Sequence, residues 1–327
     1  PMLYPVLLLL VGFVILIKGA DFLVNGASSA AKKFGVSNLA IGLTVVAFGT
    51  SMPELIVSLL SALDGKNDAS FGNVIGSNNF NLLFILGISG LIFPLVVQRN
   101  TVKYEIPLSL VAAIVLFVLV NDQLLWGSSD LPTGYQGIAS RVDGFIMLGF
   151  FGLFLIYIYR TMKQTSEMDE GDGIKIYSTW VSVGMIVAGL AMLIWGGKLV
   201  VDNAISIAQH FGLSEKLIGL TILAAGTSLP ELATSAVAAY RKNADIAIGN
   251  VVGSNIFNIF FILGITSTIS PMGYNAAMNF DMYVLFASTT LLTFFMFTLH
   301  KNKLDRWEAF LMLAAYIGYT VYLISID

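Results

Sequence analysis

Cysteine is absent from the chain, and charged side chains are scarce. Only 11% of the 327 residues are Asp, Glu, Lys or Arg, whereas 57% are hydrophobic. An ordinary soluble domain carries about 25% charged residues, so a soluble fold of this composition would expose far more apolar surface than monomers tolerate. The composition therefore excludes a soluble or disordered chain and predicts an integral membrane protein in contact with a lipid bilayer.

The missing residue types also exclude several kinds of chemistry. A chain without cysteine has no disulfides, thiolate metal sites or cysteine nucleophiles. Both histidines fall outside the long apolar segments, which argues against zinc or copper sites in the membrane. The net charge of −3 is too small to indicate nucleic acid as a partner. The sequence implies no cofactor and no protein partner.

Long apolar runs recur along the whole chain. A helix needs about 20 mostly apolar residues to cross the hydrocarbon core, and the alternating ten-residue strands typical of a membrane barrel are missing from the sequence. We therefore expect an all-α integral membrane protein with ten transmembrane helices. They cover residues 3–27, 38–62, 70–94, 102–121, 142–161, 177–203, 215–239, 246–270, 280–299 and 305–325.

Basic residues are distributed unevenly between the two sets of predicted loops. One set contains only Lys66, Arg141 and Lys216. The other contains Lys32, Lys33, Arg99, Lys103, Arg160, Lys163, Lys175, Arg241, Lys242, Lys301, Lys303 and Arg306. Because basic loops are retained on the cytoplasmic side, this asymmetry predicts a multi-pass protein of the cell membrane with both termini outside.

Two segments of the chain repeat each other. A shift of 177 residues aligns residues 34–94 with 211–271 without a gap, with 32 identities in 61 positions. The strongest matches are Gly-Thr-Ser-x-Pro-Glu, at 49–54 and 226–231, and Gly-Asn-Val-x-Gly-Ser-Asn, at 72–78 and 249–255. Self-similarity of this kind indicates duplicated halves.

The repeat suggests how the chain is organised. Five helices in each half are an odd number, so the second half would enter the membrane from the opposite side. We expect residues 2–161 to form one repeat and residues 177–327 to form a second, inverted one. A cytoplasmic linker over 162–176, too short for a regulatory calcium domain, would join them.

A proline interrupts one apolar span in each repeat. Pro53 and Pro230 lack a backbone donor and clash with the preceding turn. Each span should therefore break and free carbonyl groups around 47–49 and 224–226. Broken backbone survives in a membrane only where it is buried or lines a polar cavity. A cation in such a cavity would satisfy the carbonyls, and a passive proline kink is the alternative.

A glutamate directly follows each of these prolines. A charged group at mid-bilayer costs at least about 2.5 kcal/mol on the insertion scale. Glu54 and Glu231 occupy the same position in the two repeats, so this cost arises twice. A functional site explains two such charges better than chance does. The alternative is that each glutamate pairs with a lysine of another helix, Lys18 or Lys198. Those lysines have nearer acidic partners, Asp21 and Asp202.

Hard oxygen donors stand near both glutamates. On a helix, residues three or four apart share a face. Each glutamate therefore shares a face with the threonine and serine that precede it. On the following span, a serine shares a face with the asparagine four residues later. These candidates are Thr50, Ser51, Ser77 and Asn81 in the first repeat, and Thr227, Ser228, Ser254 and Asn258 in the second. Such oxygens suit Ca²⁺, which takes about six to eight of them, and also Na⁺. Interhelical hydrogen bonding is the alternative for the two asparagines.

The paired motifs resemble the α-repeats of the sodium/calcium exchanger family, and the whole chain is similar to prokaryotic calcium/cation antiporters. The resemblance implies a central bundle formed by helices 2, 3, 7 and 8. Helices 1 and 6 would be long, tilted and mobile against it. It also implies ion sites centred on Glu54, Asn81, Glu231 and Asn258, flanked by the hydroxyls above and by the carbonyls of Ala47 and Ala224.

The resemblance implies a secondary antiporter, and no enzyme, that exchanges Ca²⁺ for Na⁺ by alternating access. Ca²⁺/H⁺ exchange through the same glutamates stays open, as does coupling to K⁺, and a cation channel or sensor is the alternative from another class. One departure concerns Asn258, where archaeal exchangers carry Asp. The exchange reaction is therefore expected here, but the sodium-to-calcium ratio of the family is not carried over.

Overall fold

The computed structural model describes residues 3–127, 131, 133–161, 175–212, 224–298 and 300–326. Each of the ten predicted ranges contains helix among the residues described in it. Seven helices of the described chain are long and apolar enough to cross a membrane, or eight if one bent pair counts as a single span. The chain is an all-α membrane protein. Most of the predicted linker, residues 162–174, lies outside the described residues.

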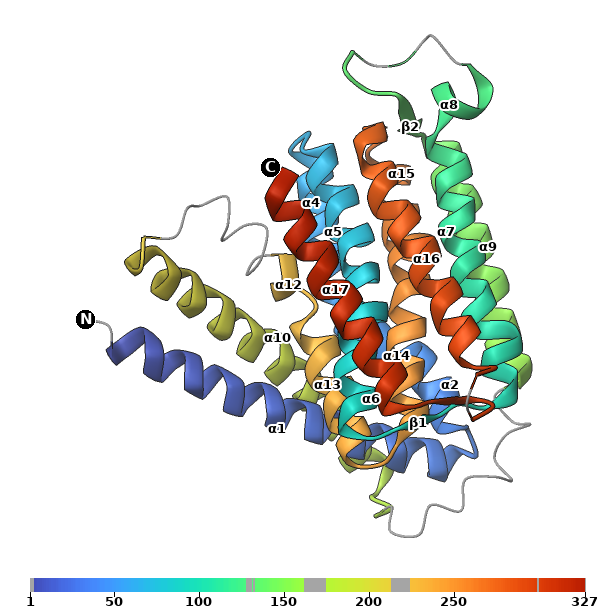
Figure 1. The fold of residues 1–327 in the computed structure, drawn as a ribbon. Helices are drawn as coiled ribbons and strands as arrows, with labels where there is room; N and C mark the ends of the chain where they lie inside the picture. The colour runs from blue at the N-terminus through green and yellow to red at the C-terminus, as the bar shows by residue number, and fades with distance from the viewer. Residues whose placement is uncertain are drawn as a thin grey trace.

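Two long helices run side by side and project from the rest of the bundle (Figure 1). They are α1 (Leu3–Phe34) and α10 (Thr179–His210), with 32 residues each. At 1.5 Å per residue each helix is about 48 Å long, which exceeds the roughly 30 Å hydrocarbon core and requires tilt. The expected length of these two helices is confirmed.

Glycines allow α1 and α10 to approach each other closely. A Cβ atom on Gly19 would lie 3.0 Å from the carbonyl oxygen of Gly189, and one on Gly189 would lie 2.8 Å from that of Gly19. Small residues at such contacts let two backbones pack in a membrane without a strong hydrophobic driving force. The helices are antiparallel, because Gly12 lies against Val200 whereas Gly26 lies against Met185.

The first half of the bundle contains two interrupted helical runs. The first comprises α2 (Asn38–Ile41), the π-helix η1 (Gly42–Val46), α3 (Ala47–Thr50) and α4 (Met52–Leu63). It bends by 46° at the break after Thr50. The second comprises α5 (Asn67–Asn79), the π-helix η2 (Phe80–Ile85) and α6 (Leu86–Ile92).

The second half has corresponding elements. They are α12 (Ala224–Gly226), α13 (Leu229–Tyr240), α14 (Ala244–Ile256), the π-helix η5 (Phe257–Leu263) and α15 (Gly264–Ile269). The run Ala244–Ile269 lies at the centre, since 94% of its apolar window is buried, against 28% for α1. The wide turns η2 and η5 contain Asn81 and Asn258, and π-turns occur frequently at functional sites.

The remaining helices surround this centre. They are η3 (Thr101–Glu105), α7 (Ile106–Val120), α8 (Asp122–Trp126), α9 (Arg141–Thr161), η6 (Ala276–Met278), α16 (Asn279–Phe295) and α17 (Arg306–Ile326). Two short antiparallel pairings join loops of the two halves at opposite ends of the bundle (Figure 1). β1 (Leu95–Val96) pairs with β4 (Lys303–Leu304), and β2 (Gly137–Ala139) pairs with β3 (Met272–Tyr274).

Candidate ion-binding site

The break between α3 and α4 places Glu54 inside the bundle. Pro53 stands in the first turn of α4, and because proline has no N–H, the carbonyl of Gly49 has no helical donor. Glu54 follows and is 0% exposed. Pro230 and Glu231 occupy the same positions at the start of α13, and Glu231 is also 0% exposed.

A serine from each half donates a hydrogen bond to the glutamate of the other half. Ser228 Oγ lies 3.0 Å from Glu54 Oε1, and Ser51 Oγ lies 2.9 Å from Glu231 Oε1. Ser77 of α5 and Ser254 of α14 lie 3.5 Å from the Oε1 atom of the glutamate in their own half. One oxygen of each carboxylate is therefore held by hydroxyls, whereas both Oε2 atoms are buried without a hydrogen-bond partner.

Asn81 and Asn258 use only their amide nitrogens. Asn81 Nδ2 donates to Asn255 Oδ1 over 3.0 Å, and Asn258 Nδ2 donates to Asn78 Oδ1 over 2.9 Å. The Oδ1 atoms of Asn81 and Asn258 are buried and have no partner. Interhelical hydrogen bonding thus accounts for the nitrogen of each side chain but not for its oxygen.

Four buried oxygens without partners therefore come from the four predicted central residues. Leaving a buried carboxylate uncompensated costs several kcal/mol, and a buried amide oxygen adds to that cost. No lysine or arginine of the described residues forms an ion pair with either glutamate, and Lys18 and Lys198 are exposed. When ionised, two carboxylates among hard oxygens fit Ca²⁺ or Na⁺.

The two threonines of the repeated motif bind asparagines of the opposite half. Thr50 Oγ1 lies 3.0 Å from Asn250 Oδ1, and Thr227 Oγ1 lies 3.2 Å from Asn73 Oδ1. Both hydroxyls keep lone pairs that can bind a cation. The threonines therefore join the two halves beside the glutamates.

The expectation of a free carbonyl at Ala47 is wrong. Its oxygen accepts from Ser51 N over 3.0 Å and lies 3.3 Å from Thr50 Oγ1. The last turn of α3 closes through Ser51 before the chain bends, so the donor lost at Pro53 affects Gly49 instead. Ala224 begins α12.

Two asparagines that the sequence reasoning did not assign hold the backbone of the glutamates. Asn73 Nδ2 donates to the carbonyl oxygen of Glu54 over 3.2 Å, and Asn250 Nδ2 donates to that of Glu231, also over 3.2 Å. Both belong to the repeated Gly-Asn-Val motif. Their repetition was the available signal, but the spacing alone did not indicate which group they would bind.

A second pair of unassigned asparagines joins the two central helices. Asn78 Nδ2 donates to the Asn255 carbonyl over 3.2 Å, and Asn255 Nδ2 donates to the Asn78 carbonyl over 3.3 Å. Each amide oxygen of this pair then accepts from Asn81 or Asn258. This network leaves the oxygens of Asn81 and Asn258 free of hydrogen bonds.

The chain is similar to known membrane proteins, among them sodium/calcium exchangers. The chain is 32% identical over 349 residues to the sodium/calcium exchanger MaX1 of Methanosarcina acetivorans, covering 98% of both chains. It is 36% identical over 283 residues to the inner membrane protein YrbG of Escherichia coli, covering 83% of this chain and 81% of that one. A solved structure of the sodium-calcium exchanger NCX_Mj superposes with a TM-score of 0.80, at 33% identity, over the full length of both chains.

The family model described as sodium/calcium exchanger protein matches residues 4–160 and 181–325. These two segments contain both glutamates, both motif copies and most of the remaining chain. The protein therefore belongs to the sodium/calcium exchanger family, whose members are transporters.

Proposed function

We propose that this chain is a secondary antiporter that exchanges Ca²⁺ for Na⁺ by alternating access. The observation that carries this proposal is the set of unpartnered buried oxygens on Glu54, Glu231, Asn81 and Asn258. The two carboxylates balance one Ca²⁺ or two Na⁺, so either cargo stabilises the same site and displaces the other.

The proposed flanking ligands are hydroxyls and carbonyls. The hydroxyls are those of Thr50, Ser51, Ser77, Thr227, Ser228 and Ser254. The resemblance adds the carbonyls of Ala47 and Ala224, and the hydrogen bonds to Ala47 make it the weaker candidate of the two.

We also propose that the chain forms ten spans in two inverted repeats, residues 2–161 and 177–327, with the 162–176 linker in the cytoplasm and both termini outside. In support, hydrogen bonds recur in pairs related by the 177-residue shift. The bond from Ser51 to Glu231 corresponds to that from Ser228 to Glu54. Substrate sites of such transporters lie at the repeat interface near the bilayer midplane.

The geometry suggests how leak without exchange is suppressed. Burying two bare carboxylates is costly, so the empty carrier is the state least able to close. A bound cation removes this cost and permits the site to be occluded. The antiparallel pair of α1 and α10 would then move as one unit against the bundle and expose the site to the other side.

Calcium flux in vesicles tests this function. Protein reconstituted in liposomes should take up radioactive Ca²⁺ when the inside holds more Na⁺ than the outside. A proton or potassium gradient alone should not drive uptake. Equal uptake with a pH gradient in place of Na⁺ would instead indicate Ca²⁺/H⁺ exchange. Flux that no gradient drives uphill and that does not saturate would indicate a channel.

A further inference from the structure

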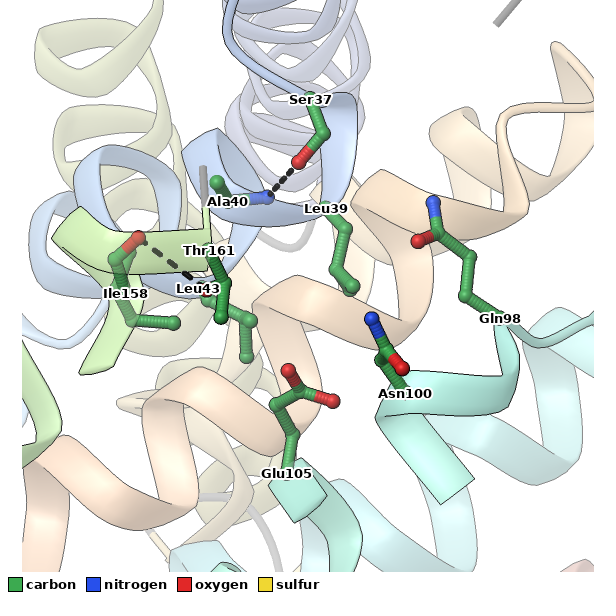
Figure 2. Close-up of a pocket in the computed structure, with 9 residues that line it drawn as sticks. All are labelled: Ser37, Leu39, Ala40, Leu43, Gln98, Asn100, Glu105, Ile158 and Thr161. Atoms are coloured by element: carbon green, nitrogen blue, oxygen red, sulfur yellow. Dashed lines mark hydrogen bonds between the residues drawn. The ribbon is translucent and has the colours of Figure 1, made fainter. Parts of the chain in front are cut away.

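A small pocket lies between the segment that leads into η3, the helix α2 and the end of α9 (Figure 2). Its volume is about 10 Å³, which is room for one water-sized particle. Glu105, Gln98 and Asn100 contribute polar side chains to its lining, and Ser37 and Thr161 contribute hydroxyls. The pocket lies outside the set of residues proposed for transport.

Glu105 provides the carboxyl group of this pocket. It is 2% exposed, and its Oε1 atom accepts a hydrogen bond from the Tyr157 hydroxyl of α9. Its Oε2 atom is buried without a partner, and no lysine or arginine of the described chain forms an ion pair with it. An ionised carboxylate in this position is costly to bury, and a cation at the free oxygen would offset that cost.

Gln98 contributes a second polar side chain to the lining of the pocket and contacts Asp245. Gln98 Nε2 donates to Asp245 Oδ2 of α14 over 2.7 Å. An ionised carboxylate only accepts, so this contact determines which end of the Gln98 amide is the nitrogen. Gln98 Oε1 is then left buried and without a partner. A ligand held in place by a neighbouring carboxylate is typical of cation sites.

We propose that this pocket binds one monovalent alkali cation, Na⁺ or K⁺, at Glu105 Oε2, with the other polar side chains of the lining as further ligands. Carboxylate, amide and hydroxyl oxygens are hard donors, and the single carboxylate balances one positive charge. The pocket also contacts Leu39 and Leu43, which precede the break at Ser51. A cation there would tie the start of this broken helix to η3 and α9.

Thermal unfolding in a variant without the transport carboxylates tests this site. In a Glu54→Gln/Glu231→Gln background, NaCl or KCl should raise the Tm by roughly 2–4 °C over N-methylglucamine chloride at equal ionic strength. Adding Glu105→Gln, which keeps an acceptor for Tyr157, should abolish the rise. Adding Asp281→Asn should preserve it, because Asp281 also binds a tyrosine hydroxyl but does not line the pocket. An equal rise with and without Glu105 would overturn the proposal.

The wild-type chain offers a second readout. Tl⁺ substitutes for alkali cations and scatters anomalously. Crystals soaked in a thallium salt should show an anomalous peak beside Glu105 as well as at the transport site. A peak between Glu54 and Glu231 with none beside Glu105 would overturn the proposal. A change in peak height on competition with Na⁺ or K⁺ identifies which ion the pocket prefers.

An ion pair between α1 and the bundle carries a second inference, which rests on the proposed alternating access. Arg241, directly after α13, donates from Nε to Asp21 Oδ1 over 2.8 Å and from Nη1 to Asn25 Oδ1 over 2.6 Å. Asp21 and Asn25 belong to α1. The arginine therefore joins the long helix to the end of the bundle that carries most basic loops.

The 177-residue shift relates this ion pair to another with its charges exchanged. Asp21 corresponds to Lys198 of α10, and Arg241 corresponds to Asp64 at the end of α4. Lys198 and Asp64 are exposed. Asp64 lies 3.8 Å from Lys66, with both side chains about two-thirds exposed or more. Both repeats therefore contain an acidic and a basic residue at equivalent positions. Of these four described residues, only Asp21 and Arg241 form an ion pair with each other in this structure.

The correspondence between α1 and α10 does not depend on this pair. Gly12 and Gly19 of α1 align with Gly189 and Gly196 of α10 at the same shift, and these glycines lie at the contact between the two helices.

Alternating access by inverted repeats lets each repeat adopt the conformation of the other. We infer that Lys198 pairs with Asp64 in the opposite-facing state, when Asp21 has separated from Arg241. Beside the first pair, Asn243 Nδ2 donates to Ser28 Oγ of α1 over 3.1 Å. The 177-residue shift relates Asn25 to Asp202 and Asn243 to Lys66, so a second pair of opposite charges would lie beside Lys198 and Asp64 in that state.

The absence of cysteine makes cross-linking a direct test. Asp21→Cys/Arg241→Cys and Asp64→Cys/Lys198→Cys would be treated in vesicles with Na⁺ and Ca²⁺ on both sides. The reagent would be a bis-methanethiosulfonate, which joins two thiols through disulfides that can be reduced. Both pairs should cross-link, and each cross-link should block flux until it is reduced. Asp64→Cys/Trp195→Cys is the control and should not cross-link. Trp195 is exposed on the same helix as Lys198, but it corresponds to Lys18, which does not pair with Arg241.

Cross-linking of the Asp21/Arg241 pair alone, in protein that exchanges ions, would overturn the second ion pair. The cross-link is detected by gel mobility, so it is judged independently of which gradient drives calcium. Failure of Na⁺ to drive Ca²⁺ uptake would count against the proposed function and not against this pair.

Discussion

Glu54→Gln and Glu231→Gln are each expected to lower sodium-driven calcium uptake by on the order of 100-fold or more. Both carboxylates are fully buried, and in the proposed function each pairs with the bound cation. Removing one partner of a buried charge pair costs about 3–5 kcal/mol. The amide keeps the size of the side chain and can still accept from Ser228 or Ser51. The measured quantity is the initial rate of calcium uptake into sodium-loaded liposomes.

Asp68→Asn is the matched control for loss of a carboxylate. Asp68 is exposed in the first turn of α5 and lies away from the glutamates, so uptake should stay near the wild-type rate. Near-normal uptake in either glutamate variant, with folded protein confirmed by size-exclusion chromatography, would contradict the assignment of the ion site.

Gly189→Ala is expected to lower the free energy of unfolding by ~1–3 kcal/mol, the usual cost of overpacking. A Cβ atom at this position would lie 2.7 Å from the backbone nitrogen of Leu23 and 2.8 Å from the carbonyl oxygen of Gly19. Backbone atoms cannot turn aside as side chains do, so α1 and α10 must separate. The Tm of the purified protein in detergent measures the change, and flux should fall because the two helices no longer move together.

Gly184→Ala on the same helix is the control. A Cβ atom there meets no atom within 4 Å, and alanine is the better helix former. Its Tm should equal or exceed that of the wild type. If both alanine variants unfold at the wild-type temperature, close packing at Gly189 does not hold the long helices together.

Much of the fold was predictable because its signals are local. The length of an apolar run indicates a span whatever surrounds it, and all ten predicted ranges contain helix in the described residues. The bend after Thr50 was also predictable, because Pro53 removes a backbone donor in any environment. The prediction that the carbonyl of Ala47 is free was wrong, however. The last turn of α3 closes before the bend, with Ser51 N donating to the Ala47 oxygen.

Partners distant in sequence were not predictable. Asp21 has Lys18 beside it in sequence, yet it pairs with Arg241, because the end of α13 reaches that face of α1. The role of Asn250 likewise depends on how α14 packs against α13, which places its amide at the carbonyl of Glu231. Glu105 gave no signal in the sequence, since its pocket forms only where η3, α2 and α9 meet.

The sequence by itself determined that the protein lies in a membrane, that its two halves repeat, and that Glu54 and Glu231 are the charges most costly to bury. These properties follow from composition and spacing, which hold in any conformation. Only the tertiary structure decided that each glutamate is bound by a serine of the other half and that one oxygen of each stays without a partner. Those contacts join residues 180 and 174 positions apart, so packing of the two halves alone brings them together.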